Sequence, residues 1–228
     1  LAGKSWQARP LLAGSAAVSG EPRPILNPAD RADQVGSVIE ADLAQVDHAL
    51  AQAAAYAEAW HRTPSAERAA MLLRAADLLE ANRAGLFSLC IREAGKTWVN
   101  AVAEVREAVD FCRYYGQQRL TGDFQNTEAP GPVVCISPWN FPLAIFIGEV
   151  SAALAVGSPV LAKPAEQTPL IAGLAVELLH QAGIPLAALQ FLPGRGETVG
   201  AALTADARVH GVVFTGSTEG AQRINQSI

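Results

Sequence analysis

The sequence predicts an α/β protein, in which a mainly helical amino-terminal region precedes a parallel sheet with helices on its faces. Three observations carry this prediction. Apolar residues recur at helical spacing through residues 42–115, whereas short β-branched runs alternate with helical patterns after residue 131. Glycine, proline and polar residues follow each of those short runs. Half of the 228 residues are apolar, so the chain can bury a sizeable core.

Residues 1–41 predict an extended amino-terminal arm. They are rich in proline, glycine and alanine, and they contain two short extended candidates, residues 24–27 and 35–39. An Asp/Arg-rich turn separates these two segments. We expect this part to lie outside the main core.

Residues 42–130 predict a helical region. Asp42 and Gln45 have the spacing of a capping box, which begins a helix that runs to about Trp60. Thr63 followed by Pro64 predicts a second helix to about Asn82, with proline in its first position, where no N–H is needed. Further helical patterns cover residues 86–93 and 98–115, with a break at Gly95-Lys96.

Residues 131–228 predict a Rossmann-like α/β part. Residues 132–136 form a β-branched apolar run typical of a buried strand. A well-marked helix has Thr168 as its cap, Pro169 in its first position and Gly183 beyond its end. The expected order continues with a helix from about Leu143, a strand at residues 160–162, the helix from Pro169, a strand at residues 189–192, a helix from Glu197, a strand at residues 212–214 and a helix from Ser217.

Composition excludes several classes of partner. The net charge is -5 and the basic residues are scattered, so we expect no nucleic-acid partner. No apolar run reaches the roughly 20 residues of a membrane-spanning helix, so we expect no transmembrane segment. The three cysteines are far apart in the sequence and form no CxxC pair, so we expect no metal site. We expect each cysteine to be a small buried side chain. An odd number of distant cysteines also predicts a reducing, cytoplasmic location. These cysteines are Cys90, Cys112 and Cys135.

The residues after the predicted strands are the candidates for binding, because ligands of open parallel sheets lie beyond the carboxyl ends of the strands. Four segments qualify: residues 137–142, 163–166, 193–196 and 215–219. Singly these signals are modest. The Gly194-x-Gly196-x-x-x-Gly200 pattern is one residue longer than the dinucleotide fingerprint, and a plain strand-to-helix turn also uses glycine.

Together, the runs SPWNFP, AKPAEQTP, PGRGETVG and FTGSTE, in this order and at these strand ends, resemble the NAD-dependent aldehyde dehydrogenase superfamily. The resemblance covers nearly the whole chain, since REAGKT at residues 92–97 and EVRE at residues 104–107 also look like that superfamily. CISPWNFPLAIF and LAKPAEQTPLIA are most similar to the Δ1-pyrroline-5-carboxylate dehydrogenase domain of the bifunctional proline utilization A family. The resemblance implies an aldehyde dehydrogenase fold that is incomplete.

The resemblance also implies a parent enzyme. That parent would oxidise a small aldehyde, glutamate γ-semialdehyde, to glutamate with NAD⁺, would form a homo-oligomer, and would carry FAD only in a proline dehydrogenase domain before Leu1. In the family the nucleophilic cysteine and the general-base glutamate lie downstream of the position of Ile228. We therefore expect a chain cut at the front end and truncated before the catalytic domain. The alternative is a stand-alone, non-catalytic dinucleotide-binding or assembly module, which would leave an exposed sheet edge.

The resemblance implies one catalytic residue, Asn140, whose side-chain amide would donate to the oxygen of the thiohemiacetal. The alternative interpretation is an asparagine that satisfies turn backbone between two prolines. Phe141 would line the substrate channel with Trp139, although aromatic residues at such bends also pack. Cys135 does not stand at the family's nucleophile position, and burial in a strand disfavours its thiolate.

For the cofactor, the resemblance implies that Lys163 and Glu166 hydrogen-bond the adenosine ribose, where a carboxylate would repel the 2′-phosphate of NADP. The alternative is a solvated charge pair. Gly216 and Ser217 would bring the pyrophosphate to a helix N-terminus, where a plain N-cap serine is equally compatible. Gly220 replaces the branched residue usual beside the adenine, so we expect a weaker contact there. The full implied cofactor set is Ile136, Ser137, Pro138, Trp139, Lys163, Glu166, Gly196, Thr215, Gly216 and Ser217.

Overall fold

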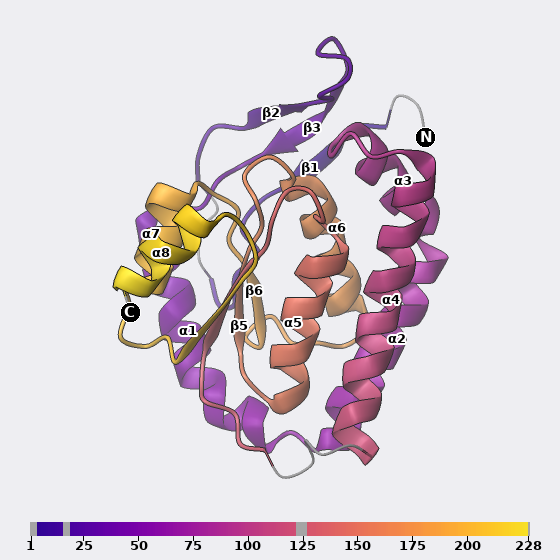
Figure 1. Ribbon diagram of the computed structural model, residues 1–228. Coiled ribbons are helices and arrows are strands. Elements are labelled where there is room, and N and C mark those ends of the chain that lie inside the picture. The colour runs from indigo at the N-terminus through magenta and orange to yellow at the C-terminus, as the bar shows by residue number, and fades with distance from the viewer. Residues whose placement is uncertain (1–3, 16–18, 122–126, 228) are drawn as a thin grey trace.

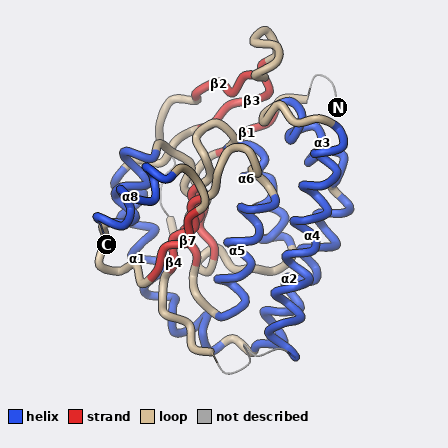
Figure 2. The backbone as a smooth tube through the Cα atoms, in the orientation of Figure 1, coloured by secondary structure: helices blue, strands red, loops and turns tan. Residues whose placement is uncertain are grey.

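The computed structural model describes residues 4–15, 19–121 and 127–227 (Figure 1). A four-stranded parallel sheet has helices on both faces, and a separate three-stranded sheet lies near one end of it (Figure 2). The predicted α/β class is confirmed.

The amino-terminal residues form the smaller sheet, with the order β1-β3-β2. Strand β1 is parallel to β3, and β2 is antiparallel to β3, which confirms both predicted extended segments. The sequence did not predict β1, because three residues are too short to show a period of two. The strands are β1 (Trp6–Ala8), β2 (Arg23–Leu26) and β3 (Gln34–Val38).

Four helices follow, and most of their predicted boundaries are confirmed. The break at Gly95 is confirmed, since Gly95 adopts a left-handed conformation with φ 67°. The fourth helix continues past its predicted end at residue 115. The helices are α1 (Leu43–Arg62), α2 (Ser65–Ala81), α3 (Arg83–Arg92) and α4 (Trp98–Thr121).

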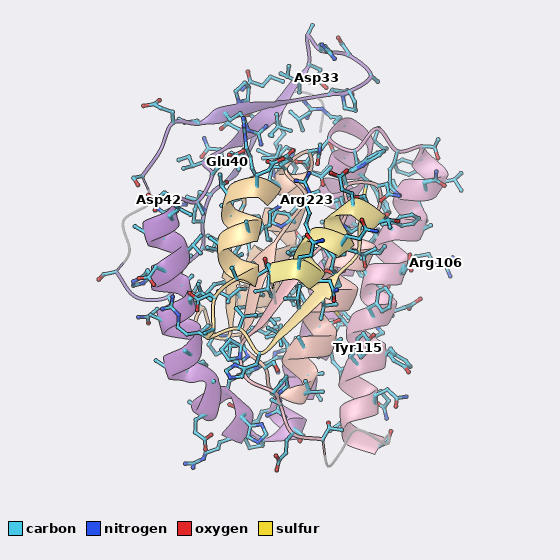
Figure 3. All side chains as sticks on the ribbon, turned by 60° about the vertical axis from the view of Figure 1, so that its left-hand side comes forward. Asp33, Glu40, Asp42, Arg106, Tyr115 and Arg223 are labelled. Carbon is cyan, nitrogen blue, oxygen red and sulfur yellow. The ribbon has the colours of Figure 1, made fainter. Side chains whose placement is uncertain are left out.

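The start of α1 is a reciprocal capping box, as predicted (Figure 3 labels Asp42 there). Gln45 N–H donates to Asp42 Oδ1 at 2.8 Å, and Asp42 N–H donates to Gln45 Oε1 at 3.1 Å. The prediction that Pro64 occupies the first position of α2 is wrong by one residue. Pro64 is the N-cap in an extended conformation, and its carbonyl accepts the first bonds of the helix, from Glu67 and Arg68.

The main sheet has the order β6-β5-β4-β7, with every pair parallel. The first of these strands in the chain, β4, therefore lies between the second, β5, and the fourth, β7. The strands are β4 (Val133–Ile136), β5 (Val160–Lys163), β6 (Leu189–Phe191) and β7 (Gly211–Phe214). The chain runs outward from β4 through β5 to β6 and then crosses back to β7 on the other side of β4, so the β4–β7 boundary is the topological switch point of the sheet.

The helices of this part confirm the predicted alternation, with one difference. The helix expected from Glu197 begins as a single π-helical turn and becomes α-helical only afterwards. The helices are α5 (Ala144–Val156), α6 (Pro169–Gln181), the π-helix η1 (Gly196–Gly200) with α7 (Ala201–Thr204), and α8 (Thr218–Ser227).

The helices form a layer on each side of the main sheet (Figure 1). Helices α2, α4, α5 and α6 lie on one side, and α1, α7 and α8 lie on the other. One cluster of buried apolar side chains includes Val38, Leu72 and Phe146, one from each predicted region. The division into residues 1–41, 42–130 and 131–228 stays a prediction. Within the described ranges, no helix is both long and apolar enough to cross a membrane.

The two edges of the main sheet differ. At the β6 edge, Leu11 forms an antiparallel bridge with Phe191. At the opposite edge, the outer side of β7 pairs with no described strand, Val213 is 39% exposed, and α8 has no buried residue. The β7 edge is therefore the exposed edge of this sheet.

Candidate functional site

An open cleft of ≈ 720 Å³ lies at the switch point, beyond the carboxyl ends of β4, β5 and β7. Every predicted site residue except Ile136 lines it. Ile136 lines an adjoining hollow of ≈ 520 Å³ that reaches α7 and α8, including Arg223 (labelled in Figure 3). The residues in the cleft are Ser137, Pro138, Trp139, Asn140, Phe141, Lys163, Glu166, Gly196, Thr215, Gly216 and Ser217.

The loop after β4 presents its side chains to solvent. Trp139 is 56% exposed and Phe141 is 41% exposed. Within the described part of the chain, the exposed Asn140 side chain makes no hydrogen bond, so it does not satisfy the backbone of its own turn. Its amide is available as a donor to a ligand in the cleft.

Lys163 lies at the end of β5 with only 4% of its surface exposed. Its Nζ donates to the Pro164 carbonyl at 2.9 Å, which leaves two further N–H donors. Burial lowers the pKa of Lys163 to about 8, and the nearby carboxylates of Glu166, Glu40 and Glu197 partly offset that effect. Lys163 is therefore a buried donor whose charge depends on neighbouring acids.

Glu166 supplies an acceptor beside this lysine. Its Oε2 is buried and has no hydrogen-bond partner among the described residues. Its carbonyl accepts from Arg23 Nη2 at 2.9 Å, and Arg23 Nε also pairs with Glu40 Oε1 at 2.9 Å. The amino-terminal sheet thus holds the loop that carries Glu166, a contact between residues 143 positions apart that no local sequence pattern signals.

The turn after β7 is built around the start of α8. Ser217 Oγ accepts from Gly220 N–H at 3.1 Å, so Ser217 behaves as an N-cap, which is compatible with anion binding at the same helix end. A Cβ placed on Gly216 would lie 2.5 Å from the Phe214 ring, and one on Gly220 would lie 2.9 Å from it. Both glycines are therefore needed while this aromatic ring lines the cleft.

Gly196 has a different environment. A Cβ at Gly196 would meet nothing within 4 Å, and its φ is not positive, so neither packing nor backbone geometry requires glycine there. At Gly194, by contrast, a Cβ would lie 2.4 Å from Val199. Packing against Val199, not backbone geometry, favours glycine at Gly194, whereas Gly196 leaves the backbone open to the cleft.

The prediction that the Thr168 side chain caps α6 is wrong. Thr168 makes no side-chain cap bond, and the N–H groups of Leu170 and Ile171 donate instead to Glu93. Helix α5 likewise has no local cap and is capped by Glu104. A glutamate from elsewhere removes the need for a local cap, and such distant partners have no local sequence signature.

None of the three cysteines lines the cleft. All three are free and buried, and burial raises the pKa of the Cys112 thiol to about 12 and raises those of Cys90 and Cys135 as well. The predicted burial of Cys135 is confirmed. No group of three or more metal-ligating side chains occurs among the described residues.

Glu149 is a buried carboxyl that the sequence did not single out. It lies on α5, both of its carboxyl oxygens are buried, and burial raises its pKa to about 8, with Thr215 opposing the shift. Its negative charge also raises the pKa of Cys135. Because Thr215 lines the cleft, Glu149 lies directly behind the cleft wall.

Comparisons with known proteins agree with this arrangement. A family model for the aldehyde dehydrogenase family matches residues 16–228. The chain is 58% identical over 225 residues to the bifunctional protein PutA of Klebsiella aerogenes, which covers 98% of this chain and 17% of that protein. It is 37% identical over 229 residues to 1-pyrroline-5-carboxylate dehydrogenase of Anoxybacillus flavithermus, covering 94% of this chain and 44% of that protein.

Solved structures show the same fold. A 1-pyrroline-5-carboxylate dehydrogenase from Thermus with bound NAD superposes with a TM-score of 0.92 at 34% identity, covering 98% of this chain and 46% of that one. Proline utilization A from Bdellovibrio bacteriovorus superposes with a TM-score of 0.91 at 30% identity. This match covers 97% of this chain and 24% of that one. The chain spans less than half the length of these relatives. The predicted aldehyde dehydrogenase fold is confirmed for the part that the chain spans, and the chain belongs to the aldehyde dehydrogenase family.

Proposed function

We propose that this chain supplies the NAD-binding part and one oxyanion donor of an enzyme that oxidises glutamate γ-semialdehyde to glutamate. The observation that carries the proposal is the cleft at the switch point, where Asn140 lies in the same hollow as Lys163, Glu166 and Ser217. The similarity to PutA and 1-pyrroline-5-carboxylate dehydrogenases supports the substrate. By the same similarity, the oxidation belongs to proline catabolism.

The residues of the cleft fit a dinucleotide. Bound NAD⁺ would accept the hydride. Glu166 Oε2 is a buried acceptor without a donor among the described residues, and Lys163 has donors to spare, which suits a pair of ribose hydroxyls. The free N–H groups at the start of α8, next to Gly216 and Ser217, suit a pyrophosphate. A carboxylate at the ribose favours NAD⁺ over NADP⁺.

Asn140 serves the reacting carbonyl in this proposal. When a thiolate adds to the aldehyde carbon, the carbonyl oxygen gains negative charge, and an oriented amide N–H stabilises that charge. In this proposal Phe141 and Trp139 line the aldehyde path beside Asn140. The solvent-facing position of Asn140, with no internal partner among the described residues, supports this role.

We further propose that the nucleophile comes from outside these 228 residues. Each of the three cysteines is buried and has a raised pKa, so none would be a thiolate at neutral pH. The chain alone is then expected to bind NAD⁺ without forming NADH. The three unpaired cysteines also support a reducing, cytoplasmic location, and the family resemblance supports a homo-oligomer.

The role of Asn140 is tested in the protein that joins this chain to its nucleophile. Asn140→Ala is expected to lower turnover by about 10²–10³, because one oxyanion donor is lost, while the Kd for NAD⁺ stays the same. Asn100→Ala, an exposed asparagine on α4, is the matched control and is expected to leave turnover unchanged. Unchanged turnover in Asn140→Ala would instead favour a non-catalytic dinucleotide-binding module.

A further inference from the structure

Two glutamates from one hairpin cap α5 and α6, the helices that follow the cleft-lining segments after β4 and β5. The N–H groups of Leu143 and Ala144, at the start of α5, donate to Glu104 Oε2 at 3.2 and 2.8 Å. The N–H groups of Leu170 and Ile171, at the start of α6, donate to the two oxygens of Glu93 at 2.6 and 2.9 Å. Each carboxylate therefore satisfies two N–H groups that the helix itself leaves unpaired.

The hairpin between α3 and α4 sets the positions of both caps. Glu93 directly follows α3 and Glu104 lies in α4, and they are separated by a tight turn at Gly95. Lys96 N–H closes this turn on the Cys90 carbonyl at 3.1 Å. The two glutamates thus lie eleven positions apart, yet they support helices whose starts lie more than twenty residues apart in the sequence.

Burial of both glutamates raises the energetic cost of losing these hydrogen bonds. Glu104 is 1% exposed and Glu93 is 4% exposed, and a carboxylate removed from water needs hydrogen bonds or an opposite charge in compensation. The positive end of each helix dipole and the two N–H groups supply part of that compensation. Neither carboxylate can be removed without leaving two buried N–H groups unpaired.

The two capping glutamates differ in whether a cation pairs with them. Lys96 Nζ pairs with Glu104 Oε1 at 2.7 Å, with the lysine side chain 12% exposed. Among the described residues no cation pairs with Glu93, and burial raises the pKa of Glu93 to about 8 despite its two backbone bonds. Among the residues that the structure describes, the Glu104 cap is therefore the one that forms an ion pair.

Each cap acts on a different half of the cleft. Leu143 and Ala144 come directly after the Asn140–Pro142 segment, and Lys96 Nζ lies 4.2 Å from the centroid of the Phe141 ring, a cation–π contact. Helix α6 begins directly after the loop that follows Lys163, the last residue of β5, and carries Glu166. The Glu104 cap thus fixes the end of the segment that carries Asn140, and the Glu93 cap fixes the end of the loop that carries Glu166.

We propose that Glu104, paired with Lys96, is a positioning residue for Asn140 and the aldehyde path, and that Glu93 is a positioning residue for the ribose-binding loop. This inference rests on the proposed function. Neither glutamate touches the cleft itself, so both act through the helices that they cap.

The test is a pair of matched substitutions in the full-length protein, Glu104→Gln and Glu93→Gln, which keep the side-chain shape and replace one acceptor oxygen by an amide NH₂ group. Glu104→Gln also removes the charge that pairs with Lys96. Glu104→Gln is expected to lower kcat for the aldehyde by about tenfold or more, because misplacing a catalytic group is costly, with the Kd for NAD⁺ within about twofold. Glu93→Gln is expected to weaken NAD⁺ binding by about tenfold, with kcat at saturating NAD⁺ within about twofold. Equal effects of both variants on both quantities, or no effect, would overturn the proposal.

A third variant covers the case in which either glutamine variant fails to fold. Lys96→Met keeps the buried glutamate cap and removes both the charge that pairs with Glu104 and the cation–π contact with Phe141, and it is expected to lower kcat without changing the Kd for NAD⁺. A change in Kd instead would contradict the division into two halves. If Asn140→Ala lowers turnover and the Glu104→Gln and Lys96→Met variants do not, the positioning inference fails while the proposed function stands.

Discussion

At the scale of single residues, the cleft depends on side chains that are buried yet incompletely bonded. Lys163 is almost fully buried and has spare donors, and Glu166 Oε2 is buried without a donor among the described residues. Unsatisfied buried polar atoms are unfavourable, so one that belongs to a cleft-lining residue is a candidate for a ligand contact. We interpret this pair as the basis of cofactor choice.

That interpretation predicts an effect of charge at Glu166. Glu166→Gln is expected to narrow the preference for NAD⁺ over NADP⁺ by about tenfold or more, because the repulsion of a 2′-phosphate is lost. The Kd values for both dinucleotides provide the measurement, and Glu177→Gln, an exposed acid on α6, is the control. An unchanged NADP⁺-to-NAD⁺ ratio would remove Glu166 from the ribose site.

Glu149 predicts a pH dependence of stability. Its pKa is about 8 in the folded chain against 4.5 ordinarily, so the folded state holds a proton that the unfolded state has released between those pH values. Stability from this group is therefore lost as the pH rises from about 4.5 to 8. Glu149→Gln is expected to gain stability relative to the parent over that range, by more than about 1 kcal/mol at pH 8.

The measurement is urea denaturation at pH 5, 6.5 and 8, with Glu58→Gln as the exposed control. The difference in free energy of unfolding between Glu149→Gln and the parent should grow with pH. A difference that stays constant would contradict the raised pKa of Glu149. Glu93, whose pKa is also about 8, leaves a residual pH dependence in both proteins.

The sequence predicted the residues that line the cleft, but not the glutamates that cap the helices beside them. The strand-end segments that contain Asn140, Lys163 and Ser217 do meet in one cleft, because parallel strands place their carboxyl ends at one edge of the sheet. Glu93 and Glu104 were missed as caps, since they act on helices 77 and 39 or more residues away. Only folding brings such partners together.

At the scale of elements, boundaries were predictable where the responsible residues are local. The Asp42–Gln45 box at the start of α1 and the position of Pro169 in α6 are confirmed. The π-turn at the start of η1 was missed, because periodicity does not separate one wide turn from an α-helix. The prediction that Thr168 caps α6 was wrong, because the distant Glu93 accepts the hydrogen bonds of that helix start instead.

The capping box predicts a measurable contribution to stability. Asp42→Ala removes the acceptor for Gln45 N–H and is expected to cost about 1 kcal/mol. For a chain of this size the loss corresponds to a Tm lower by about 2–4 °C. Glu58→Ala, which removes only an exposed i,i+4 pair with Arg62, is expected to change the Tm by less than half as much. Equal Tm changes in the two variants would show that the box adds nothing.

At the scale of the whole molecule, the sheet order decides where the cleft lies. The reversal of connections at β4 places the loops after β4 and β7 on either side of one cleft, and the amino-terminal sheet reaches the same place through Arg23. The class of fold was predictable from the alternation of patterns. The order of strands was not, because it depends on which edges pair over long sequence separations.

The most direct test of the account is the binding of NAD⁺ and NADP⁺ by calorimetry, with the protein and with its Lys163→Met variant. The account predicts saturable NAD⁺ binding, about tenfold or more tighter than NADP⁺ binding, and a clear loss of NAD⁺ affinity in the variant, because a buried donor to the ribose is removed. Binding that is absent, that favours NADP⁺, or that is unchanged by Lys163→Met would contradict the assignment of this cleft as an NAD site.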